Sequence, residues 1–248
     1  MRILLSNDDG IDARGLAVLY DALEPLGELW VVAPAAEQSA MSHSLTMHRP
    51  LRVRERAPRQ YSVDGTPADT IYVALHHVLP GPPDIVVSGI NRGANLGFDV
   101  HYSGTVAAAR EACLQGIPAV AVSARIDDAP PRYDTAGIVA RKVVERVVAD
   151  GLDPGVLLNV NVPCVAPEDL LGLRSAVLGR RLYASSVDLR HDPRGKPYVW
   201  IGGPHQGFDG PENADGRCVD AGYATITPLG VDPTDYRTLE RTRDWTDA

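Results

Sequence analysis

Close to its N-terminus the chain reads Ile3-Leu4-Leu5-Ser6-Asn7-Asp8-Asp9-Gly10. The apolar residues 3–5 are typical of a short buried strand, and two adjacent carboxylates follow that strand. In open α/β sheets, ligands bind beyond the carboxyl ends of the strands, where these residues would lie. Adjacent carboxylates disfavour joint ionisation unless a cation or proton lies between them, and hard divalent cations prefer carboxylate and amide oxygens. Residues 7–10 also suit an Asx turn that caps the next helix, so this motif alone leaves both interpretations open.

A second strand-like run, residues 85–87, is also followed by a polar loop. In that loop Asn91, Gly93, Asn95 and Gly97 alternate in an Asn-x-Gly-x-Asn-x-Gly pattern. Glycine lets the backbone turn sharply and approach a ligand closely, and asparagine offers a neutral oxygen and an amide donor. A glycine-rich surface loop is the alternative interpretation.

Ser103 precedes an apolar helical segment, residues 106–115, and is a good candidate for the N-cap of that helix. Exposed N–H groups and the positive end of the helix dipole make such a helix start a site for anions. An ordinary capped helix would have the same sequence. Two strand ends that carry oxygen ligands, together with this helix start, favour a metal and phosphate site over that alternative.

Short apolar runs and amphipathic stretches alternate over the first two-thirds of the chain. We expect strands at residues 3–5, 29–33, 85–87, 119–123 and 156–162. We expect one helix capped by Asp12, one that starts at Thr66 and Pro67, and two more over residues 106–115 and 138–148. This alternation predicts an α/β fold in which a doubly wound, mostly parallel sheet lies between two helical layers.

After about residue 170 the pattern changes, because segments rich in Gly and Pro separate short strand-like runs. Two of these runs, residues 198–201 and 223–227, are expected to form β-hairpins attached to the core rather than a second compact domain. The sequence therefore divides into an α/β core, residues 1–170, and a β-hairpin extension that returns to the core, residues 171–248.

Composition limits the classes of partner. The net charge is −8, from 32 acidic and 24 basic residues, which argues against a nucleic-acid polymer as main partner because such binding needs a basic face. The three cysteines lack metal-binding spacing and are odd in number, which favours a reducing setting. The apolar run at the N-terminus is too short for a signal peptide, and none approaches the roughly 20 residues of a membrane helix. We therefore expect a cytoplasmic protein without a membrane partner.

Short blocks in a fixed order along nearly the whole chain point to a known family. They are Asn7-Asp8-Asp9-Gly10, Ala33-Pro34, Gln38-Ser39, Gly65-Thr66-Pro67-Ala68-Asp69, Ser88-Gly89-Ile90-Asn91, Gly93-Ala94-Asn95-Leu96-Gly97, Tyr102-Ser103-Gly104-Thr105-Val106, Asn159-Val160-Asn161-Val162-Pro163 and Ile226-Thr227-Pro228-Leu229. Together they resemble the SurE (survival protein E) nucleotidase family. The resemblance implies a metal-dependent phosphatase for nucleoside monophosphates, with a Rossmann-like core and a C-terminal extension that forms a homodimer or homotetramer.

Carried over by position, the resemblance also implies a site. The implied metal ligands are Asp8, Asp9, Ser39 and Asn91. The residues implied to surround the substrate phosphate are Asn95, Ser103, Gly104 and Thr105. Those implied to be catalytic are Asp8, Asp9, Asn95 and Ser103. The implied cofactor is one divalent ion, Mg²⁺ or Mn²⁺, and the implied activity is that of a 5′-nucleotidase, a phosphoric monoester hydrolase, with 3′-nucleotides and short polyphosphate as further substrates.

The chain departs from the family pattern at four places. Ala40 and Ala107 stand where the family usually has Gly, Arg110 stands where it often has Met, and residues 216–220 replace a Thr-Asp block. Two other functions are compatible with the residues. One makes Asp8 a nucleophile that forms an aspartyl-phosphate, although haloacid-dehalogenase phosphatases use an Asp-x-Asp spacing and the acids here are adjacent. The other is a nucleotide-binding sensor that retained the pocket and lost turnover.

Overall fold

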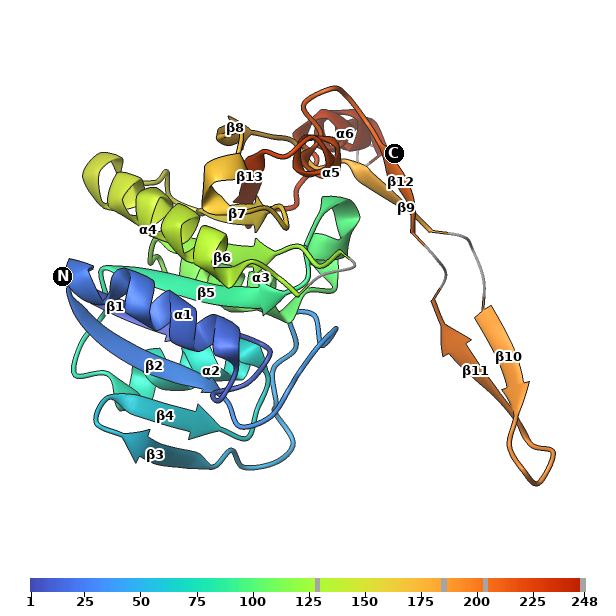
Figure 1. Cartoon of the computed structure of the whole chain (residues 1–248). Coiled ribbons are helices and arrows are strands. Elements are labelled where there is room, and N and C mark those ends of the chain that lie inside the picture. Colours follow the sequence, from blue (N-terminus) through green and yellow to red (C-terminus); the bar gives the residue numbers. More distant parts are fainter. Residues whose placement is uncertain (128–129, 184–186, 203–204, 246–248) are drawn as a thin grey trace.

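A computed structural model describes residues 1–127, 130–183, 187–202 and 205–245 (Figure 1). Its centre is a nine-stranded sheet with the strand order β3-β4-β2-β1-β5-β6-β7-β13-β8. The six parallel strands in this sheet are β4 (Gln60–Val63), β2 (Glu28–Pro34), β1 (Arg2–Ser6), β5 (Ile85–Arg92), β6 (Ala119–Ala124) and β7 (Val156–Val162). Numbered along the chain, these six strands have the order 3-2-1-4-5-6, which is the doubly wound order of Rossmann folds. The predicted fold class is therefore confirmed.

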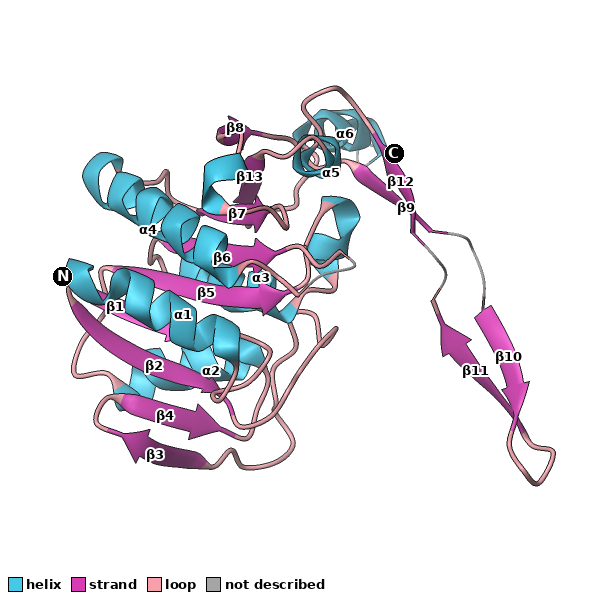
Figure 2. Ribbon diagram, viewed as in Figure 1, coloured by secondary structure: helices cyan, strands magenta, loops and turns pink. Residues whose placement is uncertain are grey.

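Helices cover both faces of the sheet (Figure 2). On one face lie α1 (Arg14–Leu23) and α4 (Tyr133–Asp150), and on the other lie α2 (Pro67–Val73) and α3 (Gly104–Leu114). Each pair packs on its own cluster of buried apolar side chains. Because both faces are covered, every residue of β6 is buried, which explains why the central strands are continuous apolar runs rather than alternating ones.

Two helix starts test the capping predictions. The helix at Thr66 begins as predicted, with a capping box in which the Thr66 hydroxyl accepts from the Asp69 N–H and the Asp69 carboxylate accepts from the Thr66 N–H. The prediction for Asp12 is wrong, because the N-cap of α1 is Ala13 and has no side-chain cap. The Asp12 carboxylate instead accepts from the Arg56 guanidinium at 3.2 Å. The helix expected over residues 138–148 begins earlier, at Tyr133.

Three strands complete the two edges of the sheet. At one edge β3 (Val53–Ala57) pairs antiparallel with β4, and at the other edge β13 (Ala224–Gly230) pairs antiparallel with β7, with β8 (Leu173–Ser175) outside it. The run at residues 223–227 was expected in an attached hairpin, but it forms most of β13 and belongs to the main sheet. Its backbone groups can pair there because β7 otherwise ends the sheet with an open edge.

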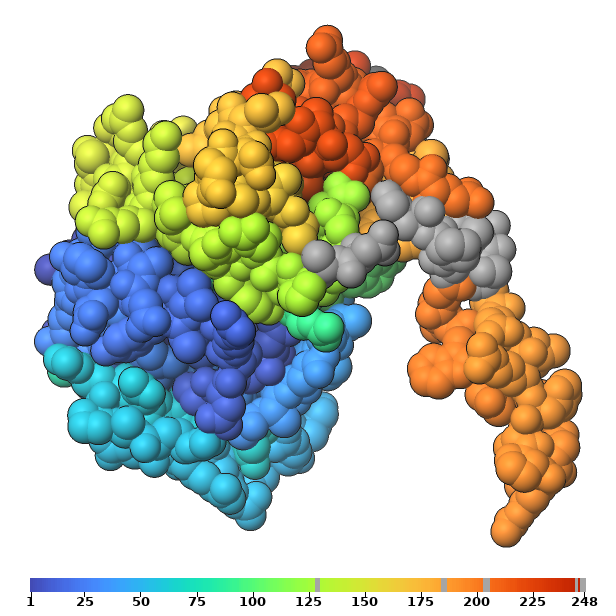
Figure 3. Space-filling model, viewed as in Figure 1, coloured from blue at the N-terminus to red at the C-terminus, as the bar shows by residue number. Residues whose placement is uncertain are grey.

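The rest of the C-terminal region lies at one end of the sheet. Its strands are β9 (Arg180–Tyr183), which pairs with β12 (His205–Asp209), and β10 (Val187–His191), which pairs with β11 (Pro197–Ile201); its helices are α5 (Asp215–Asp220) and α6 (Tyr236–Thr242). The hairpin of β10 and β11 projects from the body as an arm (Figures 1 and 3). The short helical segments are η1 (Glu24–Leu26), η2 (Ala74–Val78), η3 (Gly97–His101), η4 (Pro167–Asp169) and η5 (Arg243–Trp245). Among the described helices, none combines the length and apolar character needed to cross a membrane.

Candidate active site

The candidate site lies where the strand order of the sheet reverses, between β1 and β5. These two strands pair in parallel, so the residues after β1 and those at the end of β5 meet at the same edge. A pocket of about 770 Å³ opens there. It is lined by Asp8, Ser39, Ala40, Asn91, Arg92, Ala94, Asn95, Asp99, Tyr102, Ser103, Tyr183, Val187, Ile201 and Gly202. Crevices at such reversal points are the usual ligand sites of doubly wound folds.

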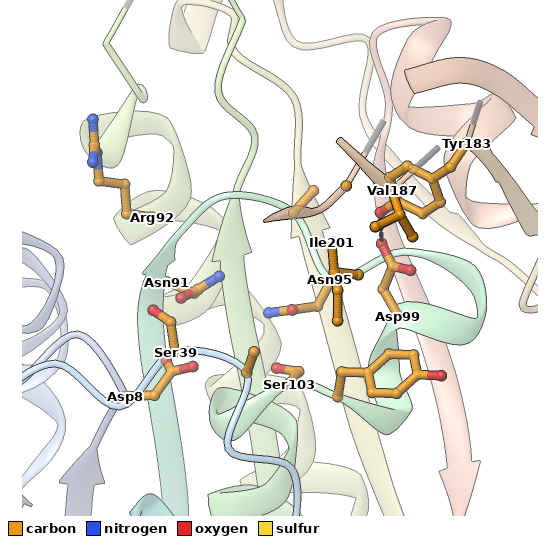
Figure 4. A pocket seen from close by; sticks show the side chains of 14 residues that line it. Asp8, Ser39, Asn91, Arg92, Asn95, Asp99, Ser103, Tyr183, Val187 and Ile201 are labelled. Atoms are coloured by element: carbon orange, nitrogen blue, oxygen red, sulfur yellow. Dashed lines mark hydrogen bonds between the residues drawn. The ribbon is translucent and has the colours of Figure 1, made fainter. Parts of the chain in front are cut away.

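Three of the four predicted metal ligands line this pocket together. The side chains of Asp8, Ser39 and Asn91 gather on one wall of the pocket (Figure 4). The Asn91 amide donates through Nδ2 to the Gly93 carbonyl at 2.8 Å, which leaves Oδ1 as its available ligand atom. The Ser39 hydroxyl donates to Glu37 Oε1 at 2.7 Å, so its oxygen lone pairs are available to a cation.

Asp9 occupies a different position from the other three. Its Oδ2 accepts from the Arg92 N–H at 2.9 Å, and it lines a smaller neighbouring pocket together with Glu37 and Tyr133. Burial raises the pKa of Asp9, the Arg92 N–H opposes that rise, and the charge of Glu37 adds to it. The two adjacent carboxylates therefore border two neighbouring hollows rather than a single one.

The surroundings of Asp8 explain why a cation fits here. Asp8 is only 4% exposed, and this burial raises its pKa to about 6, against the opposing effect of a hydrogen bond from Thr105. A Cβ on Gly104 would lie 2.8 Å from the Asp8 Cβ, so only glycine lets α3 pack this closely on the carboxylate. The ligand atoms available to a cation are carboxylate, hydroxyl and amide oxygens, the set that Mg²⁺ and Mn²⁺ prefer. Within the described ranges no group of three His, Cys, Asp or Glu side chains could hold a metal, so the candidate set relies on neutral oxygens as well.

The predicted phosphate residues lie beside this wall. Ser103 is the N-cap of α3, as predicted, and its Oγ accepts from the Val106 N–H at 3.1 Å. Among the hydrogen bonds of the described residues, none engages the Gly104 N–H, whereas the Thr105 N–H interacts with the Asp8 carboxylate and opposes the rise of its pKa. Gly104 lies in the first turn of α3, where a free N–H group suits an anion. The Thr105 hydroxyl donates to Asp8, so it holds that carboxylate.

A network of asparagines fixes the Asn95 loop. The Asn95 N–H donates to Asn161 Oδ1 at 2.8 Å, and the Asn95 carbonyl accepts from Asn159 and Asn161. The Asn95 side chain donates to Ser123 Oγ at 2.8 Å. These partners come from β6 and β7, so the rigid sheet places Asn95 at the pocket wall.

Comparison with known proteins identifies the family. The family described as "Survival protein SurE" matches residues 3–185 of the chain. The chain belongs to the SurE family. It is 50% identical over 254 residues to the 5′-nucleotidase SurE of Anaeromyxobacter sp. (strain Fw109-5), covering 99% of this chain and 96% of that protein. It is 45% identical to the 5′-nucleotidase SurE of Geotalea uraniireducens (strain Rf4), with 99% of both covered. The crystal structure of the SurE protein from Aquifex aeolicus has a TM-score of 0.90, at 37% identity over the whole of both chains.

This SurE chain also has a pocket wall that the sequence did not indicate. Tyr183, Val187 and Ile201 line the side of the pocket away from Asp8 (Figure 4), and Tyr102 also lines the pocket. Asp99 stands among them and accepts from the Tyr183 hydroxyl at 2.5 Å. Burial and this bond raise the pKa of Tyr183 to about 12, so the phenol stays protonated. An apolar and aromatic wall next to a polar one suits a ligand with a flat base and a phosphate.

A second residue missed from the sequence is Asp215, which immediately precedes the segment 216–220 that departs from the family pattern. It is fully buried, and its carboxylate accepts from the N–H groups of Gly97, Gly179 and Gly216 at 2.7–3.0 Å. It thereby holds the loop that follows Asn95. No local pattern reveals this role, because two of the three donors lie 36 and 118 residues away in the chain.

Proposed function

We propose that this chain is a 5′-nucleotidase that hydrolyses nucleoside monophosphates to nucleoside and phosphate with one bound Mg²⁺ or Mn²⁺ ion. The observation that carries the proposal is that Asp8, Ser39 and Asn91 share one pocket with Asn95 and the Ser103 helix start. An oxygen-rich cation site beside an anion-binding helix start suits a phosphomonoester. The names of the relatives support the same reaction.

The residues divide the work as follows. Asp8, Ser39 and Asn91, which share one pocket wall, would hold the ion together with Asp9 at the border of the adjacent hollow. When bound, the ion neutralises phosphate charge and lowers the pKa of a coordinated water. Asn95, Ser103, Gly104 and Thr105 would surround the phosphate, and the Gly104 N–H would be one of the donors to its oxygens. Donors fixed in advance stabilise the charge that develops there in the transition state without reorganising.

The aromatic wall explains the choice of substrate. Tyr102 is 66% exposed at the pocket mouth, so its ring is available to the base of a nucleotide. We include 3′-nucleotides and short polyphosphate as further substrates, since the phosphate side of the pocket recognises a terminal phosphoryl group rather than a particular ester.

The remaining parts of the proposal concern assembly and setting. We propose that residues 1–170 form the catalytic core and residues 171–248 an extension that joins chains into a homodimer or homotetramer. The exposed hairpin of β10 and β11 supports this assembly. We place the protein in the cytoplasm, and its three free cysteines, Cys113, Cys164 and Cys218, are consistent with a reducing compartment.

Release of inorganic phosphate tests the proposed function. The purified chain is assayed with nucleoside 5′-monophosphates, nucleoside 3′-monophosphates and tripolyphosphate, each with Mg²⁺, Mn²⁺ or chelator. We expect metal-dependent turnover that chelator abolishes. Nucleotide binding without phosphate release under all metal conditions would instead identify a sensor. A nucleotide substrate with a radiolabelled phosphate tests the aspartyl-phosphate route. An acid-stable radiolabel on the protein after turnover would identify that route.

A further inference from the structure

A partly buried contact between His43 and Glu111 connects the loop that carries Ser39 to helix α3. His43 Nε2 lies 2.7 Å from Glu111 Oε2, and the two side chains are 22% and 5% exposed. The other carboxylate oxygen of Glu111 accepts from Gln115 Nε2 at 3.0 Å. Neither His43 nor Glu111 lines the pocket, and the proposed chemistry uses neither of them.

The loop between Ser39 and His43 has an unfavourable backbone. Ala40 has a φ of 59° and Ser42 a φ of 53°. Residues other than glycine seldom adopt this left-handed region, because Cβ then crowds the backbone. Such residues persist only where the surrounding structure holds them in place. Glycine would adopt this region without cost, so with Ala at position 40 the turn needs something to hold it.

The contacts around the turn show what holds it. The Ser42 N–H donates to the Tyr102 carbonyl at 3.1 Å, and the Ser42 hydroxyl donates to the His101 carbonyl at 2.9 Å. The next residue in the chain, His43, contacts Glu111. The turn at residues 39–42 is thus closed against η3 and α3, and the same helix begins at the Ser103 cap. One helix therefore positions both the Ser39 ligand and the phosphate site.

We propose that His43 and Glu111 are positioning residues that hold the strained turn at residues 39–42 on α3 and thereby keep Ser39 at the metal site. The inference rests on the proposed function, because Ser39 is a ligand only there. The ionisation of Glu111 agrees with it, since the hydrogen bond with His43 keeps the pKa of Glu111 below its usual value despite burial. Glu111 therefore remains a charged acceptor at neutral pH.

Mn²⁺ affinity without substrate tests the pair directly. We expect His43→Ala to weaken Mn²⁺ binding about tenfold in titration calorimetry, the lower end of the loss seen when groups that orient metal ligands are removed. Amide exchange over residues 38–44 should become faster in the metal-free protein. The KM for nucleotide at saturating Mn²⁺ should stay within about twofold of the wild-type value, because the phosphate and base walls are intact. Glu111→Gln, which keeps a neutral hydrogen bond to His43, should fall between wild type and His43→Ala.

His48 supplies a matched control, because it lies in the same loop but is exposed. His48→Ala should bind Mn²⁺ like wild type. Ala40→Gly tests the strain itself, since glycine adopts the left-handed region without cost. In the Ala40→Gly background, His43→Ala should lose less Mn²⁺ affinity than it does alone.

Three results would overturn the inference. They are a folded His43→Ala protein with Mn²⁺ affinity within twofold of wild type, an equal loss in His48→Ala, or an undiminished loss in the Ala40→Gly background. If the Glu111 variants do not fold, His43→Gln supplies the same comparison from the exposed side of the pair. A wild-type protein that binds no Mn²⁺ overturns the proposed function first, and this outcome is distinguishable because it precedes any comparison of variants.

Discussion

Asp8 is the residue on which the electrostatics of the pocket depend. Its burial raises its pKa to about 6, above the ordinary value near 3.9 that it has in the unfolded chain. The folded metal-free protein therefore binds a proton more tightly than the unfolded chain does. The protonated Asp8 contributes stability that is fully present below about pH 4 and is lost as the pH rises through about 6. At neutral pH the ionised, buried Asp8 carboxylate therefore destabilises the metal-free fold. A bound cation would remove this destabilisation.

Asp8→Asn should abolish turnover, because it removes a charged ligand from a hard-cation site. In chelator at pH 7.5 the same variant should melt at a higher temperature than wild type, since the ionised buried carboxylate is gone. The metal-free wild type should gain stability between pH 7.5 and pH 5, and this gain should be smaller in Asp8→Asn. Phosphate release and thermal melts across this pH range check the prediction.

Asp12 provides the control for this prediction, since it lies four residues away and its side chain is 77% exposed. Asp12→Asn should leave both turnover and the pH dependence of melting close to wild type. Wild-type turnover in Asp8→Asn at saturating metal, or a large loss of metal-free stability, would contradict the assignment of Asp8.

Ser103→Ala separates the phosphate site from the metal site. We expect turnover to fall by about 10²–10³-fold, as for other donors that act on the transition state. Mn²⁺ affinity should hardly change, and the lost helix cap should cost about 1 kcal/mol of stability. Turnover, Mn²⁺ binding and melting of the one variant check all three.

Asp235→Ala is the matched control, because Asp235 caps α6 by accepting from the Thr238 N–H and does not line the pocket. It should lose stability without losing turnover. If Ser103→Ala behaves in the same way, Ser103 is an ordinary cap and the phosphate site depends more on Asn95.

At the scale of single residues, the sequence predicted where a residue lies in the fold better than it predicted which way its side chain points. Residues that follow a parallel strand or begin a helix at one sheet edge must converge, so Asp8, Asn91 and Ser103 could be placed together in advance. The direction of a side chain depends on local backbone rotation and neighbours, which no spacing reveals. Asp9 therefore borders the adjacent hollow, and the Thr105 hydroxyl holds Asp8.

At the scale of the elements, Asp215 holds three segments of the chain together. Its buried carboxylate connects the loop of η3, the turn before β9 and the start of α5 through backbone N–H groups. A carboxylate has enough lone pairs to accept from several donors at once. The C-terminal segment is therefore connected to the pocket, and among its described residues those that line the pocket are Tyr183 of β9, Val187 and Ile201 of the hairpin, and Gly202.

Asp215→Asn should destabilise the fold by about 3 kcal/mol, because the amide nitrogen cannot accept and would face buried N–H donors. The loosened loop at Gly97 should also raise the KM for nucleotide, since Asn95 begins that loop. Urea denaturation and steady-state kinetics check the two effects. Asp220→Asn on the same helix, where an exposed side chain pairs with Arg125, should change neither by much. Equal effects in the two variants would show that α5 as a whole, rather than the carboxylate, matters.

Which elements could be predicted follows from their surroundings. Five parallel strands, β1, β2, β5, β6 and β7, are mostly buried, so their apolar runs are strong and they were predicted. The sixth, β4, was not predicted, because it has only four residues and two of them are half-buried. β3 lies at an edge with exposed charged residues, and its stretch resembles a loop. The place of β13 beside β7 joins segments more than sixty residues apart, which local propensity does not encode.

At the scale of the whole molecule, the arm formed by β10 and β11 is the part that depends most on contacts from outside itself. Val187 pairs with Ile201 and Leu189 pairs with Val199, so these four apolar side chains share one face of a two-stranded ribbon. All four are at least half exposed, and Ile201 reaches 92%. An isolated two-stranded ribbon is marginal in water, and an apolar face of this kind marks an interaction surface. A second copy of the chain, offering the same face, is the simplest cover.

We therefore expect the wild-type protein to be a homodimer or homotetramer at micromolar concentration, as measured by light scattering. Leu189→Lys should shift it toward monomer, because an ammonium group would be buried in an apolar contact. Leu189 does not line the pocket, but its neighbours in the ribbon, Val187 and Ile201, do. Loss of assembly should thus raise the KM for nucleotide while Mn²⁺ affinity is kept. Ile138→Lys, on the exposed side of α4, is the control and should leave the assembly intact. A monomeric wild type would refute the assembly, and a Leu189→Lys monomer with unchanged KM would show that the arm does not shape the pocket.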